Sequence, residues 1–398
     1  MQKKYIIIGT SAAGLSAAIK LRDLDPESSI TCLTSEQEMP YNRCLLADFL
    51  SGNKPAERIA TKPQEFFDEK NITLMRNARV VHIDRPNKRV LLHDSRALFY
   101  DKLFIGTGRS GWIPNITGSY LSGVFPFYDL ADGNNILAFI KQHHVTRATV
   151  VGAGLSGLEC ADALATLGLQ VHVVEQAAHV LPRQLDTEGG ALLAQLMQQA
   201  GVTLLAQNQV TEITGTDNRV SGITLANKTK IPCQLVVFAI GGRVNSALAQ
   251  TAGLTLHGQG ILVDSNMRTN DENIFAGGDV CVVKDVLTGE LVQSCLWADA
   301  AMQGMAAACT MANVERVYPG SLIITSSTIY ETTFVTCGPI TNPLAHYTKT
   351  VRKGAGFYHA FLTHDGQLKG FAMVGKVNNV GMLRKKLVDK TPFDPAEI

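Results

Sequence analysis

Two glycine-rich turns, each lying between an apolar β-like run and a helical pattern, restrict the fold of this chain more than any other feature. The first reads "GTSAAG" from Gly9, and the second reads "GAGLSG" from Gly152, 143 residues later. Small residues at these spacings let a pyrophosphate approach a helix N-terminus, where unpaired N–H groups and the helix dipole favour anions. The sequence therefore predicts an α/β chain with two dinucleotide sites.

The first turn matches the dinucleotide fingerprint only in part. Gly9 and Gly14 occupy its first and last positions, whereas Ser11 replaces the middle glycine. A side chain as small as serine still admits a pyrophosphate. The helical pattern continues to about Leu24, and Glu36 follows the next β-rich segment. Glu36 is therefore a candidate for binding ribose hydroxyls.

The second turn matches the fingerprint fully. Gly152, Gly154 and Gly157 fill all three glycine positions, and Glu175 ends the next β-rich segment. The alternative is a glycine-rich turn that binds nothing. The strand, turn and helix in the right order, followed by the acid at the right distance, favour dinucleotide binding.

Glu175 also bears on the choice of cofactor. A carboxylate accepts hydrogen bonds from both ribose hydroxyls but repels a 2′-phosphate. At an effective dielectric near 20, a like-charge contact at about 4 Å costs about 4 kcal/mol, or about a thousandfold in affinity. The following "QAAHV" supplies no arginine to offset this repulsion. We therefore expect NADH to be preferred over NADPH.

Composition excludes several classes of partner. The 398 residues imply two or three domains. A net charge of +1 gives no electrostatic footprint for nucleic acid or an anionic membrane surface, and no apolar run is long enough for a membrane span. The eight cysteines form no CxxC pair and no zinc-ligand spacing. We expect a cytoplasmic enzyme without a bound metal.

Two further turns carry recognisable chemistry. "FIGTGRS" spans residues 104–110, and "NIFAGGDV" spans residues 273–280 with Asp279 after two glycines. An acid in such a turn can hold a sugar alcohol such as ribityl. The alternative is an ordinary surface β-turn.

Taken together, residues 5 to about 313 resemble the pyridine nucleotide-disulfide oxidoreductase superfamily, the glutathione-reductase-like flavoproteins with two dinucleotide-binding domains. The resemblance implies FAD at the first site, with Glu36 on the adenosine ribose, Val80 beside the adenine and Asp279 on the ribityl chain. It implies NADH at the second site. The implied FAD contacts are Gly9, Ser11, Ala13, Gly14, Glu36, Arg43, Val80, Asp279 and Trp297. Thr107, Gly108 and Gly241 are further implied cofactor contacts. The implied NADH contacts are Gly152, Gly154, Leu155, Ser156, Gly157 and Glu175.

Within the superfamily, "LPRQLD" (181–186) and "LWADAAMQGMAAA" (296–308) are most similar to NADH:rubredoxin reductases and to the flavin domain of assimilatory nitrite reductases. This resemblance implies that the helix after Trp297 points its N-terminus at the flavin pyrimidine, where it would stabilise the anion formed on reduction. Trp297 would then be a wall of the flavin pocket. A buried Ala/Met helix is the plainer interpretation, and both can hold together.

The stretch "PYNRCLL" contains the candidate redox thiol, Cys44. The resemblance implies that Arg43 lies close to the flavin ring and tunes it by charge. Cys44 falls where coenzyme A disulfide reductases and NADH oxidases carry a single redox cysteine, whereas rubredoxin reductases have another residue there. A working thiol needs a lowered pKa, which Arg43 and a helix N-terminus can supply. The alternative is a small buried apolar residue.

Glu159 follows Gly157 by two residues. It matches a glutamate that the family places near the nicotinamide and the flavin, so we include it with Arg43 and Cys44 among the candidate catalytic residues. The alternative is an acid in the first turn of a helix, favoured there by the helix dipole.

The expected organisation is discontinuous. An FAD-binding domain comprises residues 1–110 and 241–316, and an NAD-binding domain (111–240) is inserted between its two parts. Residues 317–398 are expected to form a small α+β domain with an antiparallel sheet, in which "HDGQ" makes a hairpin turn.

The expected activity is hydride transfer from NADH to FAD, followed by electron transfer to a small redox protein. Two alternatives remain at this point. One is a single-cysteine disulfide reductase or NADH oxidase that uses Cys44. The other is an NADH-responsive signalling flavoprotein, similar to the apoptosis-inducing-factor relatives.

Overall fold

The computed structural model describes residues 2–398. Its contacts divide the chain into two compact units, which are described separately. The first unit comprises residues 1–44, 56–110 and 243–322, and the second comprises residues 45–55, 111–242 and 323–398.

The first unit is built on a five-stranded sheet with the order β20-β7-β1-β2-β3, in which neighbouring strands run parallel. Its strands are β1 (Lys4–Ile8), β2 (Ser29–Leu33), β3 (Ile72–Met75), β7 (Lys102–Ile105) and β20 (Ile274–Ala276). Nearly continuous apolar runs form these strands, as expected for a parallel sheet that is buried on both faces.

The register of this sheet brings three sequence motifs to one edge. Ile8 at the end of β1 pairs with Ile105 at the end of β7, and Ile105 pairs with Ala276 at the end of β20. The turns that follow these three strand ends hold the first glycine fingerprint, the "GTGRS" motif and the Gly-Gly-Asp motif. The carboxyl edge of a parallel sheet is where open α/β folds bind their ligands.

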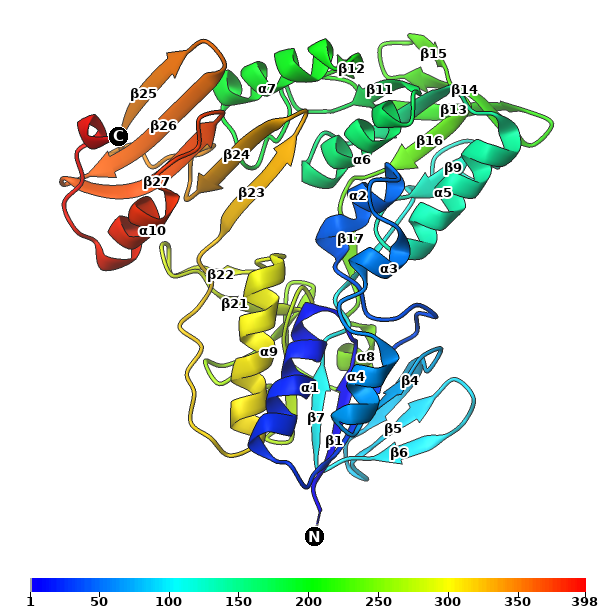
Figure 1. Cartoon of the computed structure of the whole chain (residues 1–398), viewed down its shortest axis with the longest axis vertical. Coiled ribbons are helices and arrows are strands. Elements are labelled where there is room, and N and C mark those ends of the chain that lie inside the picture. The colour runs from blue at the N-terminus through cyan, green and yellow to red at the C-terminus, as the bar shows by residue number, and fades with distance from the viewer. Residues whose placement is uncertain (1) are drawn as a thin grey trace. The chain divides into compact units, whose positions relative to one another are not determined.

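Two helices, α1 (Ala12–Leu24) and α9 (Trp297–Met311), pack against each other beside this sheet (Figure 1). They approach closely because α9 carries a glycine at the crossing, where a Cβ on Gly304 would lie 2.0 Å from the Ala13 carbonyl oxygen. Ile7 and Phe104 are fully buried in the core of the unit. Burial of each such side chain contributes about 1.5–3 kcal/mol.

Smaller elements complete the first unit. An antiparallel sheet contains β4 (Val80–Asp84), β5 (Arg89–Leu92) and β6 (Ala97–Phe99). A four-stranded sheet contains β18 (Leu256–His257), β19 (Gly260–Leu262), β21 (Cys281–Lys284) and β22 (Leu291–Val292). Three short helices are α3 (Ala56–Ile59), α4 (Gln64–Glu69) and α8 (Ala247–Thr251).

The second unit holds another parallel sheet, of order β12-β11-β10-β16-β9. Its strands are β9 (Val124–Pro126), β10 (Arg147–Val151), β11 (Gln170–Val174), β12 (Val202–Leu205) and β16 (Leu235–Phe238). Its longer helices are α5 (Leu130–His143), α6 (Leu155–Thr166) and α7 (Thr187–Gln199). Val151 at the end of β10 pairs with Val174 at the end of β11, so the second glycine fingerprint and Glu175 follow neighbouring strand ends.

The C-terminal part of the second unit is an antiparallel sheet of order β23-β24-β27-β26-β25. It contains β23 (Ile324–Ile329), β24 (Thr332–Cys337), β25 (Thr348–Gly354), β26 (Phe357–His364) and β27 (Gln367–Val374), followed by α10 (Val380–Asp389) and the 3-10 turn η2 (Pro395–Glu397). The predicted "HDGQ" hairpin is confirmed, because Asp365 and Gly366 connect β26 to β27 with φ angles of +51° and +67°. Both angles suit a two-residue turn with positive φ at each central position.

The remaining elements are a three-stranded sheet, the short helix α2, and segments near the points where the chain passes between units. The sheet contains β13 (Val210–Thr216), β14 (Arg219–Leu225) and β15 (Lys230–Pro232), and α2 spans Leu46–Leu50. The segments are η1 (Arg43–Leu45), β8 (Arg109–Gly111) and β17 (Gly242–Val244). By contacts, residues 45–55 and 323–398 group with 111–242.

Within residues 2–398, none of the helices has the length and apolar character needed to cross a membrane.

Candidate functional site

The first glycine turn is shaped so that only glycine fits at two of its positions. A Cβ on Gly9, whose φ is +95°, would lie 2.1 Å from the Gly106 carbonyl oxygen, and a Cβ on Gly14 would lie 1.8 Å from the Gly9 carbonyl oxygen. Ser11 is the N-cap of α1, and its side chain makes no capping hydrogen bond. The first turn of α1 contains no acid. The turn therefore presents helix N–H groups with no negative charge to repel a pyrophosphate.

The second glycine turn separates the packing role of glycine from its binding role. A Cβ on Gly157 would lie 2.0 Å from the Gly152 carbonyl oxygen, whereas a Cβ on Gly154 would meet no atom within 4 Å. Gly154 is the N-cap of α6, whose first turn also lacks an acid. The open space at Gly154, beside an unblocked helix N-terminus, is what a closely approaching pyrophosphate requires.

Glu175 is fixed against the second turn. Its Oε2 accepts a hydrogen bond from the Ala153 backbone N–H at 2.7 Å, and its Oε1 accepts one from the Ala177 N–H at 2.8 Å. A carboxylate has about four acceptor sites, so each oxygen can still accept a ribose hydroxyl. The Glu175 side chain is thus held in a fixed position beside the fingerprint turn, where an acid was expected to bind the ribose.

The Gly-Gly-Asp turn is held by two glutamines that the sequence analysis did not single out. The Gly278 N–H donates to Gln303 Oε1 at 2.7 Å, and Gln293 Nε2 donates to the Asp279 carbonyl oxygen at 3.1 Å. Gln303 is only 1% exposed. The turn is thus anchored to a buried side chain, unlike an ordinary surface β-turn, and the position of Asp279 is defined.

A buried carboxylate fixes the first turn of α9. Asp299 is 4% exposed and accepts hydrogen bonds from the Tyr318 hydroxyl, from Ser321 Oγ at 2.7 Å and from Gln303 Nε2 at 3.2 Å. Burial and the bond to Asp299 raise the pKa of Tyr318. Because Gln303 also holds the Gly-Gly-Asp turn, one network connects the N-terminus of α9 to Asp279. The sequence signal for this network is a pair of polar residues, Asp299 and Gln303, four positions apart on an Ala-rich helix.

Arg43 and Glu36 form an ion pair. The guanidinium carbon of Arg43 also lies 5.1 Å from the centroid of the Tyr41 ring. The family resemblance implies that Glu36 binds the adenosine ribose and that Arg43 lies at the flavin ring, two distant parts of FAD, whereas the two residues pair in the structure. Glu36 therefore lies next to the Arg43 guanidinium and offsets part of its charge.

Cys44 is exposed, and its backbone N–H donates to Asn42 Oδ1 at 3.0 Å. The alternative that Cys44 is a small buried apolar residue is therefore wrong. Cys295, just before α9, is also exposed and has a φ of +52°, a feature that no sequence pattern indicated. The other cysteines are buried, and burial raises the pKa of Cys32 to about 12. An accessible thiol is what disulfide chemistry needs, whereas buried thiols are inert.

Glu159 is partly buried in α6. The helix begins at Leu155 and has no acid in its first turn, so the alternative of a first-turn acid is wrong. Ser327 Oγ donates to Glu159 Oε1 at 2.7 Å. Burial raises the pKa of Glu159 to about 7, and the charges of Asp48 and Asp162 add to this shift, while the bond from Ser327 opposes it. The carboxyl can therefore take up or release a proton near neutral pH.

The other predicted site residues lie at or near the same turns. Thr107 Oγ1 donates to the Asn245 carbonyl oxygen at 2.8 Å, and Asn245 Nδ2 donates back to the Thr107 carbonyl oxygen at 3.0 Å. This reciprocal pair fixes the "GTGRS" turn. The remaining positions are Ala13 in α1, Val80 at the start of β4, Gly108 and Gly241 with positive φ, Leu155 and Ser156 at the start of α6, and Trp297 at the start of α9.

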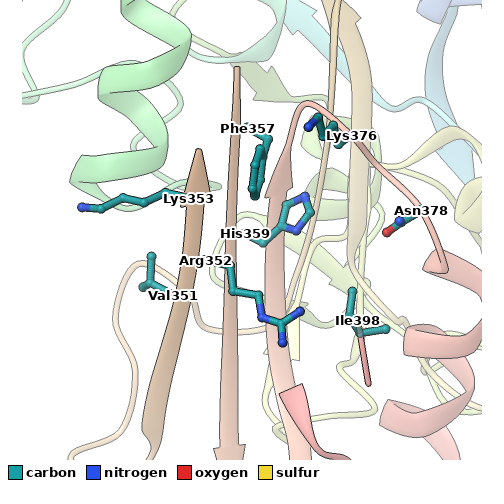
Figure 2. A pocket seen from close by; sticks show the side chains of 8 residues that line it. All are labelled: Val351, Arg352, Lys353, Phe357, His359, Lys376, Asn378 and Ile398. Carbon is teal, nitrogen blue, oxygen red and sulfur yellow. The ribbon is translucent and has the colours of Figure 1, made fainter. Parts of the chain in front are cut away.

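A hollow of about 560 Å³ lies in the C-terminal part of the second unit (Figure 2). It is lined by Val351, Arg352, Lys353, Phe357, His359, Lys376, Asn378 and Ile398. Lys353 pairs with Glu188, and the Lys376 ammonium lies 4.9 Å from the centroid of the Phe357 ring. None of the predicted dinucleotide contacts lines this hollow. No group of three or more His, Cys, Asp or Glu in the part of the chain that the structure describes is placed to hold a metal ion.

Comparison with known proteins agrees with this geometry. The family model described as pyridine nucleotide-disulphide oxidoreductase matches residues 3–313. The chain belongs to this family. The match covers the first parallel sheet, both glycine turns, the Gly-Gly-Asp turn and α9. The chain's cofactors are therefore FAD and NADH, and the two glycine turns fit the pyrophosphates of these dinucleotides.

Individual relatives agree with the family assignment. Nitrite reductase [NAD(P)H] of Bacillus subtilis is 34% identical over 289 residues, which make up 72% of this chain and 35% of the relative, so the chain spans about a third of that enzyme. Rubredoxin-NAD(+) reductase of Pseudomonas putida is 32% identical over 291 residues, or 72% of this chain and 74% of the relative. The crystal structure of a ferredoxin reductase from Rhodopseudomonas palustris has a TM-score of 0.90 and 26% identity, covering 100% of this chain and 97% of that one.

Proposed function

We propose that the chain is an FAD-dependent oxidoreductase that takes a hydride from NADH and passes the electrons to a small redox protein. The observation that carries this proposal is the presence of two dinucleotide cradles in one chain, each with glycines that permit close packing and a helix N-terminus free of acids. Bound FAD supplies the chemistry that side chains lack, since it accepts a hydride and can release electrons to a second partner.

The side chains of this protein have the tasks of binding, orienting and proton exchange. Gly9, Gly14 and Ser11 form the cradle that retains FAD, and the network from Asp299 through Gln303 positions the Gly-Gly-Asp turn. Holding two reactants in a fixed geometry removes a large part of the barrier to reaction.

Glu159 is proposed to act beside the bound nicotinamide. Its pKa of about 7 lets the carboxyl change protonation at a working pH near neutrality, which suits a group that exchanges a proton. Glu159→Gln tests this role through the pH dependence of kcat, because a glutamine cannot titrate. An unchanged pH profile would show that Glu159 does not take part.

NADH is proposed as the reductant in preference to NADPH. Glu175 is held against the fingerprint turn by two backbone N–H groups, so it cannot easily withdraw from a 2′-phosphate. Glu175→Arg should shift the ratio of kcat/KM values for NADH and NADPH toward NADPH. A ratio equal to that of the wild type would contradict the assignment of Glu175 to the ribose.

A small redox protein is the proposed acceptor because relatives similar to this chain are named for rubredoxin and ferredoxin reduction. The exposure of Cys44 favours a second candidate, reduction of a disulfide through this thiol. The test is steady-state NADH oxidation with rubredoxin, a two-iron ferredoxin and a low-molecular-weight disulfide as separate acceptors. Cys44→Ser should leave the rates with the proteins unchanged. Loss of the protein-dependent rate in Cys44→Ser, or turnover with the disulfide alone, would refute the redox-protein assignment.

A further inference from the structure

Arg109 is a partly buried cation whose surroundings point to a missing partner. It is the first residue of β8, directly after Gly108, and its Nη2 donates to Gln293 Oε1 at 3.0 Å. Its Nε is buried and has no hydrogen-bond partner within the described part of the chain, and no carboxylate among the described residues pairs with it. A buried donor on a charged group is costly when unsatisfied, and Arg109 follows a turn at the carboxyl edge of the sheet, where α/β folds bind ligands, so we expect a partner outside the polypeptide at this position.

The connections of Arg109 indicate which part of the cofactor is near. Gln293 links the Arg109 guanidinium to the carbonyl oxygen of Asp279, the residue assigned to the ribityl chain. Gln293 also precedes the N-terminus of α9 by only a few residues, and Trp297 begins that helix. Glu36, the acid assigned to the adenosine ribose, pairs with Arg43 instead.

We propose that Arg109 contacts FAD at its flavin end, with Nε donating to an oxygen of the ribityl-flavin portion. Its positive charge then favours the reduced flavin, which carries more negative charge than the oxidised form. Gln293 is the positioning residue that fixes the guanidinium and the Asp279 turn relative to each other. The inference rests on the binding of FAD by the first unit, and it adds a contact that the glycine fingerprints do not contain.

The experiment compares Arg109→Met and Arg109→Lys with the wild-type holoprotein. Two quantities are measured for each: the dissociation constant of FAD and the midpoint potential of the bound flavin, by redox titration against a reference dye. Loss of a hydrogen bond to a charged group should weaken FAD binding at least about tenfold in Arg109→Met. The midpoint potential should fall by about 30 mV for every tenfold by which the reduced form loses more affinity than the oxidised form.

Arg268→Met is the matched control. Arg268 is in the same unit and also has a buried Nε without a partner, but it lies opposite Phe275 of β20. Burial is the main reason that the pKa of Lys102, the first residue of β7, is lowered, and the Arg268 charge adds to it. Arg268 is therefore near the amino end of the sheet, and its variant should keep the wild-type potential and FAD affinity.

The outcomes are distinct. A lower potential and weaker FAD binding in Arg109→Met, with a smaller loss of potential in Arg109→Lys, would support the contact. Wild-type values in both variants would overturn it, and weaker FAD binding at an unchanged potential would overturn its placement at the flavin end. If Arg109→Met does not fold, Arg109→Lys decides, because it keeps the charge but lacks the Nε donor and must still lose FAD affinity. Absence of FAD from the wild type would refute the proposed function instead.

Discussion

Replacement of Glu159 by glutamine should change how the stability of the protein depends on pH. Glutamine has the same shape and keeps an oxygen that accepts the hydrogen bond from Ser327 Oγ, but it cannot carry a charge. In the wild type, burial raises the pKa of Glu159 from 4.5 to about 7. The substitution therefore removes the cost of a partly buried carboxylate with little change in packing.

The sign and the size follow from proton linkage. The unfolded chain releases the Glu159 proton near its ordinary pKa of 4.5, whereas the folded chain keeps it to about pH 7. Between these values the folded state binds more protons, so the wild type loses stability as pH rises, and the full loss is present above the folded pKa. The difference in pKa corresponds to about 3 kcal/mol, most of which develops between pH 5 and pH 8.

The assay is thermal unfolding of the wild type and Glu159→Gln at the same scan rate across that range. For a domain of this size about 1 kcal/mol shifts Tm by about 2–4 °C, so the variant should gain about 5–10 °C over the wild type between pH 5 and pH 8. Glu188→Gln is the control, because Glu188 lies on the surface and its pair with Lys353 is worth at most about 1 kcal/mol. Parallel pH profiles for the wild type and Glu159→Gln would refute the assignment of a raised pKa.

Two further predictions concern the glycine turns and the buried network. Gly157→Ala should disrupt the second unit, because its Cβ would lie 2.0 Å from the Gly152 carbonyl oxygen, whereas Gly154→Ala should fold normally and raise the KM for NADH. Circular dichroism and NADH kinetics compare the two variants. Equal effects on folding would contradict the separation of roles. Tyr318→Phe removes a hydroxyl donor from buried Asp299 and should lower the free energy of unfolding by about 1–3 kcal/mol, which is measured as a lower Tm. An unchanged Tm would show that the network contributes no stability.

The parts of the fold that the sequence predicted well are those with local signals. The helix after the first glycine turn was expected to end near Leu24, and α1 ends there. Apolar runs before each fingerprint became parallel strands, and the "HDGQ" turn became a hairpin. In each case, the pattern of apolar residues and the backbone freedom of glycine act within a few residues of each other.

The parts that the sequence could not give depend on residues far apart in the chain. The hydrogen bonds from Gln303 to Gly278 and from Tyr318 to Asp299 form only after the sheet and α9 have packed. Arg43 and Glu36 illustrate the same point, since the resemblance placed them at opposite ends of FAD and the fold pairs them. Long-range polar contacts have no periodic signature, so they are found only in the folded structure.

Anaerobic mixing of the purified holoprotein with NADH tests the central claim most directly, because the claim is that one cradle retains FAD while the other admits a diffusible reductant. The wild type should carry one FAD per chain, and NADH should bleach its absorption rapidly. Gly154→Ala should carry the same amount of FAD but need more NADH to reach the same bleaching rate, because only the second cradle is altered. A wild-type protein without flavin, or a bound flavin that NADH does not bleach, would contradict the account.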